Sequence, residues 1–295
     1  MAYKIAIASG KGGTGKTTVS VNLFYFLQDK ITKNILLVDC DVEEPNDSLF
    51  FPEAKIIQKE KINQLIPEID KEKCAYCRKC VEYCEFNAIV IIPHVHFSEV
   101  NESLCHSCGA CKLACENNAI IEKHLSIGEV IKYNNGLIEG KLKIGSAMQT
   151  LLIKELKKSI QDDPDILIYD APPGTSCPVV ETVIDAHYVI LVTEPTPFGL
   201  YDLKLTIALL EKLEKPFGVI INKAGLGNNE VYKFLEEEKI EILAEIPFNQ
   251  DYAHKYASGL ILNDIPDEVI AQYKEIIEKL EKRILVYEGD NYFKW

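Results

Sequence analysis

The sequence has little positive charge, and lysine supplies almost all of it. Its 295 residues carry 32 Lys and Arg against 45 Asp and Glu, which gives a formal net charge of −13, and arginine occurs only as Arg78 and Arg283. This balance argues against nucleic acid as a main partner, because phosphate backbones are bound by basic surfaces. Any phosphate that the protein does bind must be neutralised mainly by lysines.

Long apolar runs and export signals are missing as well. No apolar segment approaches the length of a bilayer-spanning helix, so we expect no membrane partner. The N-terminal MAYKIAIASG passes from a short apolar strand directly into glycines, without the cleavage site of a signal peptide. Ten cysteines in a chain without an export signal favour metal ligation over disulfides, and the cytoplasm is the expected compartment.

Apolar segments with the form of buried parallel strands recur along the chain. They occupy residues 3–9, 34–41, 165–174, 188–195 and 216–225. Segments with helical spacing of apolar residues occupy 147–160, 200–214, 229–238 and 267–286, and the final DNYFKW is expected to be a tail. The alternation predicts an α/β fold with a doubly wound, mostly parallel sheet that binds ligands at the carboxyl ends of its strands.

The region around residues 60–125 interrupts this rhythm with cysteine repeats and short β-like pieces. A predicted hairpin follows, with Asn135 and Gly136 at its turn. We therefore predict one discontinuous α/β domain, residues 1–59 and 126–295, with a small α+β domain inserted at 60–125. An insertion at a surface loop leaves the parent core intact.

The segment GKGGTGKTT matches the phosphate-loop pattern G-x4-G-K-[ST] between a predicted strand and a predicted helix. Its glycines let backbone N–H groups turn toward phosphate oxygens, and the helix N-terminus adds favourable partial charge. Lys16 is expected to reach the β- and γ-phosphates, and the Thr17 hydroxyl to ligate Mg²⁺. The predicted nucleotide-binding residues of the loop are Gly10, Lys11, Gly12, Gly13, Thr14, Gly15, Lys16, Thr17 and Thr18.

The second lysine of the loop, Lys11, produces the form KGGTGKT. This resembles the deviant Walker A signature of the P-loop ATPase superfamily that contains MinD, ParA and the nitrogenase iron protein. In that family this lysine reaches across a dimer interface to the partner's nucleotide. The resemblance implies an ATP-sandwich homodimer, or a heterodimer with a paralogue, in which Lys11 acts beside Lys16 where other enzymes use an arginine finger. The alternative is a solvated lysine beside a phosphate loop.

Two further segments extend the resemblance to the switch regions. LLVDCD resembles the switch I strand, which implies that Asp41 orients or activates the attacking water and that Asp39 belongs to the Mg²⁺ shell. IYDAPPG resembles Walker B and switch II, which implies Asp170 on the metal and Gly174 near the γ-phosphate. Each aspartate alone could be a strand-end cap, but their order at the ends of buried strands favours the site.

The base-binding end is indicated by two segments near the C-terminus. INKAG places Asn222 where the family contacts the base, and Gly225 stands where a GTPase needs aspartate, so ATP is favoured over GTP. The segment at 246–259 resembles the adenine-proximal loop of the family, with Pro247 near the base.

The cysteine spacing C-x2-C-x2-C-x3-C occurs twice, as the bacterial ferredoxin pattern for two [4Fe–4S] clusters requires. In that pattern the fourth cysteine of each run ligates the other cluster. The predicted ligands are Cys74, Cys77, Cys80 and Cys115 for the first cluster, and Cys105, Cys108, Cys111 and Cys84 for the second. Zinc is the alternative, although structural zinc sites usually take two ligands from each of two places.

The repeat continues past the cysteines, because CEFNAIVI aligns with CENNAIIE and suggests two pseudo-symmetric halves. Glu85 and Glu116 replace the proline that usually follows the fourth cysteine, which leaves ligation possible while altering loop rigidity and potential.

Two cysteines stand outside these runs. For Cys40 and Cys177 the first expectation is a buried small residue, and the alternative for Cys177 is a cluster shared with a dimer mate.

Over nearly its whole length the chain resembles MinD-superfamily ATPases that contain an inserted ferredoxin domain. The first hypothesis is a slow, partner-stimulated, Mg²⁺-dependent ATPase whose nucleotide state gates electron transfer through two [4Fe–4S] clusters to a redox partner. The second is an ATP-dependent carrier or scaffold for iron–sulfur cluster or metallocofactor assembly, similar to ApbC, with a cluster-acceptor partner. The third, spatial positioning as in MinD and ParA, is disfavoured because the final predicted helix lacks a basic membrane-binding face.

Overall fold

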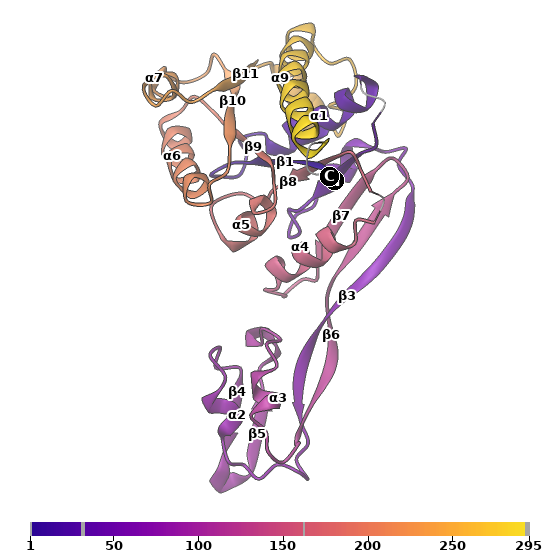
Figure 1. The fold of residues 1–295 in the computed structure, drawn as a ribbon, viewed down its shortest axis with the longest axis vertical. Coiled ribbons are helices and arrows are strands. Elements are labelled where there is room, and N and C mark those ends of the chain that lie inside the picture. Colours follow the sequence, from indigo (N-terminus) through magenta and orange to yellow (C-terminus); the bar gives the residue numbers. More distant parts are fainter. Residues whose placement is uncertain (1, 31–32, 162, 293–295) are drawn as a thin grey trace. The chain divides into compact units, whose positions relative to one another are not determined.

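The computed structural model describes residues 2–30, 33–161 and 163–292, and the chain divides into two compact units (Figure 1). The first unit consists of Met1–Lys59, Val130–Lys141 and Ile153–Trp295, and the second of Glu60–Glu129 and Leu142–Leu152. The predicted insert therefore lies inside the second unit, which also takes in a loop that follows the predicted hairpin. Two long strands, β3 (Ile56–Ile69) and β6 (Ile120–Tyr133), have residues in both units.

A mostly parallel sheet forms the centre of the first unit, in the order β11-β10-β9-β1-β8-β2-β7-β6-β3. This confirms the predicted α/β class. Every residue of β2 and β8 is buried, as expected for parallel strands covered on both faces. Besides β3 and β6, the strands of the sheet are β1 (Tyr3–Ala8), β2 (Ile35–Asp39), β7 (Leu137–Leu142), β8 (Ile166–Asp170), β9 (Tyr188–Thr193), β10 (Phe217–Ala224) and β11 (Ile242–Pro247).

Helices cover this sheet, and α1 packs with α9 against the core strands (Figure 1). The helix α9 extends to Tyr292, six residues beyond the predicted end at 286, so the first half of the predicted tail is helical, and 293–295 lie outside the described residues. The helices are α1 (Lys16–Lys30), α4 (Gln149–Lys158), α5 (Cys177–Val183), α6 (Pro197–Lys212), α7 (Glu230–Glu237), α8 (Gln250–Ala257), α9 (Asp267–Tyr292) and the 3-10 helix η1 (Asp47–Phe50).

Strand register brings acidic residues together at one edge of the sheet. Asp39, the last residue of β2, pairs with Asp170, the last residue of β8. On the other side of β2, Asp39 pairs with Glu139 of β7. Because β1 and β8 are also parallel neighbours, the loop that joins β1 to α1 leaves the sheet at this same edge. The fold therefore positions a site at the carboxyl ends of the strands, as the sequence predicts.

The second unit contains an antiparallel pair, β4 (Ile89–Ile92) with β5 (Phe97–Val100), in which Ile89 lies opposite Val100. Buried isoleucines of this pair and of β6 pack against cysteines, so the small core consists largely of the residues around the cysteine runs. The remaining elements are the short helices α2 (Lys79–Glu82) and α3 (Ala110–Leu113) and the 3-10 helices η2 (Pro93–Val95) and η3 (Glu102–Leu104).

Several elements were not predicted because local sequence pattern does not indicate them. The sequence of β3, IIQKEKINQLIPEI, mixes charged residues with apolar ones and shows no buried run, and its first six residues are exposed. Local pattern did not predict β11 or α5 either. Among the described residues, no helix combines the length and the apolar character needed to cross a bilayer.

Replacement of Leu37 by Ala tests the packing of β2. Leu37 is fully buried between β7 and β8, whereas Leu49 in η1 is 66% exposed. We expect Leu37→Ala to lower the free energy of unfolding by about 2–5 kcal/mol because it leaves a cavity in a close-packed core. Leu49→Ala, the matched control, is expected to change it by less than about 0.5 kcal/mol. Urea denaturation followed by circular dichroism measures both, and equal effects would contradict the packing described here.

Candidate functional site

The phosphate loop runs from the end of β1 to the start of α1, and its glycines are required by backbone conformation at Gly13 and Gly15 and by close contacts at Gly10 and Gly15. Gly13 and Gly15 have φ values of +76° and +98°, a region that other residues rarely adopt. A Cβ at Gly15 would lie 2.1 Å from Nδ2 of Asn222, and one at Gly10 would lie 2.4 Å from the carbonyl oxygen of Asp202. The loop is therefore wedged between neighbouring elements, with its backbone held in one shape.

Two side chains from the end of β10 hold this shape. Nδ2 of the buried Asn222 donates to the carbonyl oxygen of Thr14 at 2.7 Å, and Nζ of Lys223 donates to that of Gly13 at 2.9 Å. The structure thus brings Asn222 to the loop itself, in a positioning contact that its predicted role at the base did not include. Gly12 is exposed at the outer turn of the loop.

The residues predicted to bind Mg²⁺ come from three elements: Thr17 from the first turn of α1, and Asp39 and Asp170 from the ends of β2 and β8. Oγ1 of Thr17 donates to Oδ2 of Asp170 at 2.9 Å. Lys16 is buried, and this burial lowers its pKa while the nearby carboxylates of Asp170, Asp41 and Asp39 oppose that shift. A lysine that is poorly hydrated and faces carboxylates has little solvent to displace when it binds phosphate oxygens.

A third aspartate joins this group, which the sequence reasoning missed. One carboxylate oxygen from each of Asp39, Asp47 and Asp170 lies within 4.8 Å of the others, and all three side chains are buried. Asp39 is fixed by backbone N–H groups, of Asp41 at 3.0 Å, Asn46 at 2.9 Å and Asp47 at 3.2 Å. Burial raises the pKa of each of these carboxyl groups, and their mutual repulsion adds to it for Asp39 and Asp47. The signal in the sequence was an acidic residue soon after switch I, in EEPNDS.

Asp41, the predicted water-activating residue, is less buried than this cluster. Burial, with the charge of Asp170, raises the pKa of Asp41 to about 6. A carboxylate with a pKa near neutrality is suited to accept and release a proton during turnover.

Lys11 is partly exposed and is engaged in an ion pair within its own chain. Its Nζ forms an ion pair with Oε1 of Glu194 at 2.5 Å, and Lys223 pairs with Oε2 of the same carboxylate at 3.0 Å. Burial alone would raise the pKa of Glu194, but the hydrogen bonds from the two lysines hold it below its usual value. Glu194 lies just after β9 and was not predicted from the sequence.

The other predicted nucleotide residues take these places. Gly174 has a φ of +93°, and its N–H donates to the carbonyl oxygen of Ser9 at 2.9 Å, which ties switch II to the phosphate loop. Thr18 lies in the first turn of α1, where its carbonyl oxygen accepts a hydrogen bond from Asn22 at 2.7 Å. Pro247 ends β11 and pairs with Ala224 of β10.

In the second unit the cysteines gather around two cavities. One is lined by Cys74, Cys77, Cys80 and Cys115, and the other by Cys84, Cys105, Cys108 and Cys111. Each cavity thus takes three thiols from one run and the fourth from the other run. Four sulfur donors around one cavity match the ligand set of a [4Fe–4S] cluster, so the residues fit that group.

Corresponding positions of the two runs have the same backbone conformation. The φ values of Tyr76 and Ser107 are +53° and +54°, and those of Asn87 and Asn118 are +51° and +50°. Such values direct backbone N–H groups at the thiols: Sγ of Cys84 and of Cys115 accept from the N–H groups of Ala88 and Ala119 at 3.3 and 3.2 Å. Hydrogen bonds to ligating sulfurs stabilise negative charge there and tune cluster potential.

Burial among other thiols also affects the acidity of the predicted cysteine ligands. Burial raises the pKa of Cys80 and of Cys111 to about 11, and neighbouring thiols contribute to both shifts. The two remaining cysteines differ from each other. Cys40 is fully buried, as expected, but the same expectation was wrong for Cys177, which is exposed at the first residue of α5, where the chain leaves switch II.

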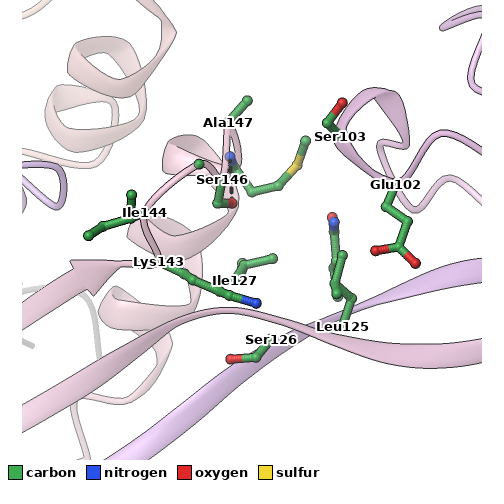
Figure 2. Close-up of a pocket in the computed structure, with 12 residues that line it drawn as sticks. Glu102, Ser103, Leu125, Ser126, Ile127, Lys143, Ile144, Ser146 and Ala147 are labelled. Carbon is green, nitrogen blue, oxygen red and sulfur yellow. Dashed lines mark hydrogen bonds between the residues drawn. The ribbon is translucent and has the colours of Figure 1, made fainter.

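A third cavity of the second unit, of about 550 Å³ including space open to solvent, is shown in Figure 2. Lys143 and Glu102 lie on different segments of its wall, together with Ser103, Leu125, Ser126, Ile127, Ile144, Ser146 and Ala147. Gln64 also lines it and accepts a hydrogen bond from Ser107, a residue of the second cysteine run, at 3.3 Å. No residue of the predicted sites belongs to this lining in the described part of the chain.

Known proteins resemble this chain over nearly its full length. An uncharacterized protein of Methanocaldococcus jannaschii is 34% identical, over 95% of this chain and 97% of its own. The iron-sulfur cluster carrier protein of Pyrococcus abyssi is 27% identical, over 98% of this chain and 88% of its own. The septum site-determining protein MinD of Pyrococcus horikoshii, solved with Mg-ADP, has the same fold, with a TM-score of 0.59 at 19% identity and coverage of 96% and 97%.

A family description, the CobQ/CobB/MinD/ParA nucleotide binding domain, matches residues 5–263. This span contains the phosphate loop, both switch segments and the cysteine-rich unit. The chain therefore belongs to the CobQ/CobB/MinD/ParA family of nucleotide-binding P-loop proteins.

Proposed function

We propose that the protein is a Mg²⁺-dependent ATPase that holds two [4Fe–4S] clusters and whose nucleotide state gates electron transfer from them to a partner protein. The two four-cysteine cavities carry this proposal, because each draws ligands from both halves of the small unit. A cluster held in this way is resident, since its release would require both halves to open. Each bound cluster would supply a site that accepts and gives up one electron at a time.

The hydrolytic half of the proposal follows from the residues around the phosphate loop. Lys16 and the loop N–H groups bind the phosphates, while Thr17, Asp39 and Asp170 would hold Mg²⁺, which would neutralise phosphate charge. Asp41 accepts the proton of the attacking water as its oxygen bonds to the γ-phosphorus. The bond from that phosphorus to the bridging oxygen breaks, and ADP leaves with the electron pair.

Coupling between the two halves is proposed through the chain that joins them. The segment after Asp39 contains Asp41 and Asp47 and leads into β3, which continues into the cysteine-rich unit. A segment that responds to the γ-phosphate is a common switch in P-loop proteins. Its displacement would be transmitted along β3, a hydrogen-bonded strand, to the residues that precede the first cysteine run.

A second candidate is an ATP-dependent carrier that delivers clusters to an acceptor protein in the cytoplasm. It is favoured by the Pyrococcus abyssi relative, whose name is iron-sulfur cluster carrier protein. The two candidates share the ATPase and the clusters, and they differ in whether the cluster leaves the protein.

Anaerobic redox titration of the protein with and without MgATP distinguishes them. For electron transfer we expect both clusters to stay bound and their midpoint potential or EPR spectrum to change on addition of MgATP. If the protein is a carrier, we instead expect loss of iron from the protein and appearance of a cluster in an apo-ferredoxin acceptor. Unchanged spectra with no transfer would contradict both.

Cysteine replacement tests the grouping of ligands. Cys77 lines the first cavity, whereas Cys177 is similarly exposed but lies in the other unit. We expect Cys77→Ser to lose roughly half of the bound iron and Cys177→Ser to lose none, because each cluster depends on its own four thiolates. Iron analysis and visible absorbance measure this, and equal iron in both variants would contradict the assignment.

Lys11 tests the proposed ATP-sandwich dimer. If Lys11 must leave Glu194 to reach the partner's nucleotide, Lys11→Ala abolishes ATP-dependent dimerisation, whereas Glu194→Gln tightens the dimer by roughly threefold, the strength of a partly exposed ion pair. Lys212→Ala, an exposed lysine of α6, serves as the control. Light scattering with a non-hydrolysable ATP analogue measures the dimer, and an unchanged dimer in Lys11→Ala would refute the sandwich.

A further inference from the structure

The carboxylates at the ends of β2, β7 and β8 carry more negative charge than their surroundings offset. Asp39, Asp47 and Asp170 are at most 1% exposed, and Glu139, the register partner of Asp39, is 5% exposed. Lys16 lies close enough to act on Asp170, but one lysine does not neutralise four carboxylates. Buried charge at this density is costly unless a counter-charge is bound.

Several oxygens of these carboxylates have no hydrogen-bond donor among the described residues. Both Oδ1 and Oδ2 of Asp47 are buried without a partner, as are Oδ1 of Asp170 and Oε2 of Glu139. Oδ2 of Asp170 accepts a hydrogen bond from Thr17, whereas Oδ1 accepts none from the described residues. Fully buried oxygens without donors are rare in folded proteins and mark a strained site or an unrepresented ion.

The backbone of Asp47 holds this residue in place. It is the first residue of η1, and its N–H donates to Asp39 at 3.2 Å. This fixes the Asp47 carboxylate beside Asp39 while its oxygens stay available as ligands. A side chain positioned in this way meets the requirement of a metal ligand, which must be oriented before the ion binds.

We propose that Asp39, Asp47 and Asp170 form a divalent-cation site that binds Mg²⁺ or Mn²⁺ in the absence of nucleotide, with Glu139 adding charge behind them. One carboxylate oxygen of each lies within 4.8 Å of the others, which suits ligands placed about 2.1 Å from one small ion. Oxygen donors of this kind select Mg²⁺ and Mn²⁺ over softer metals.

This metal site belongs to the proposed ATPase, and its purpose rests on that proposed function. The metal would already be in the protein when the nucleotide arrives, so the protein could bind free ATP as well as MgATP. Asp47 becomes a further metal ligand beside the predicted Thr17, Asp39 and Asp170.

Mn²⁺ titration of the cluster-loaded protein tests the site directly. The clusters are kept oxidised under anaerobic conditions, no nucleotide is present, and free Mn²⁺ is counted by room-temperature EPR. We expect one Mn²⁺ per chain, with affinity lowered roughly tenfold or more in Asp47→Asn. Glu53→Gln, an exposed acidic residue of the segment between η1 and β3, is the matched control and is expected to bind as the wild type does.

Two results would overturn the proposal: no Mn²⁺ bound by the wild type without nucleotide, or wild-type affinity in Asp47→Asn. Melting in EDTA shows whether the variant folds, and we expect Asp47→Asn to melt at a higher temperature than the wild type because it removes a buried unpaired charge. If the wild type binds Mn²⁺ without nucleotide but does not hydrolyse ATP, the proposed function alone is refuted. If it hydrolyses ATP but binds no Mn²⁺ without nucleotide, this site alone is refuted.

Discussion

The parallel pairing of β2 with β8 sets Asp39 beside Asp170, and the proposed nucleotide site is arranged around that pair. Parallel register aligns the carboxyl ends of neighbouring strands at one edge, so residues far apart in the chain meet there without any local signal. The phosphate loop leaves β1 at the same edge and presents Thr17 to Asp170. Burial, together with the nearby charge of Asp170, raises the pKa of Asp39, which makes this edge a place that favours cations.

A second constraint operates on the phosphate loop from outside. Asn222 and Lys223 of β10 donate hydrogen bonds to its carbonyl oxygens. Close contacts leave no room for a side chain at Gly10 or Gly15. The loop is therefore preorganised, and binding of phosphate does not have to provide the energy to order it. Glu194 forms ion pairs with both Lys223 and Lys11, and so connects β10 to the first lysine of the loop.

The cysteine-rich unit has a small core in which cysteines take a large part. Its isoleucines pack against the thiols themselves, and the two halves repeat the same backbone conformation. Buried thiols have raised pKa values, so bare thiolates are unfavourable there, whereas bound iron would offset their charge. The cysteines thus contribute to the small core and, in the proposed function, would also bind the clusters, as in other metal-binding domains too small for a large apolar core.

The sequence alone determined the features that depend on short-range pattern: the phosphate loop, the apolar runs of β1, β2 and β8, and the spacing of the cysteines. Steric and coordination rules act over a few residues there, so spacing is sufficient. Only the tertiary structure decided that Asp47 joins Asp39 and Asp170, that Glu194 pairs with Lys11, and that Cys177 is exposed. These contacts join residues brought together by strand order or by the path of a loop, and an aspartate in a polar turn has the same local sequence whether it faces water or a buried metal site.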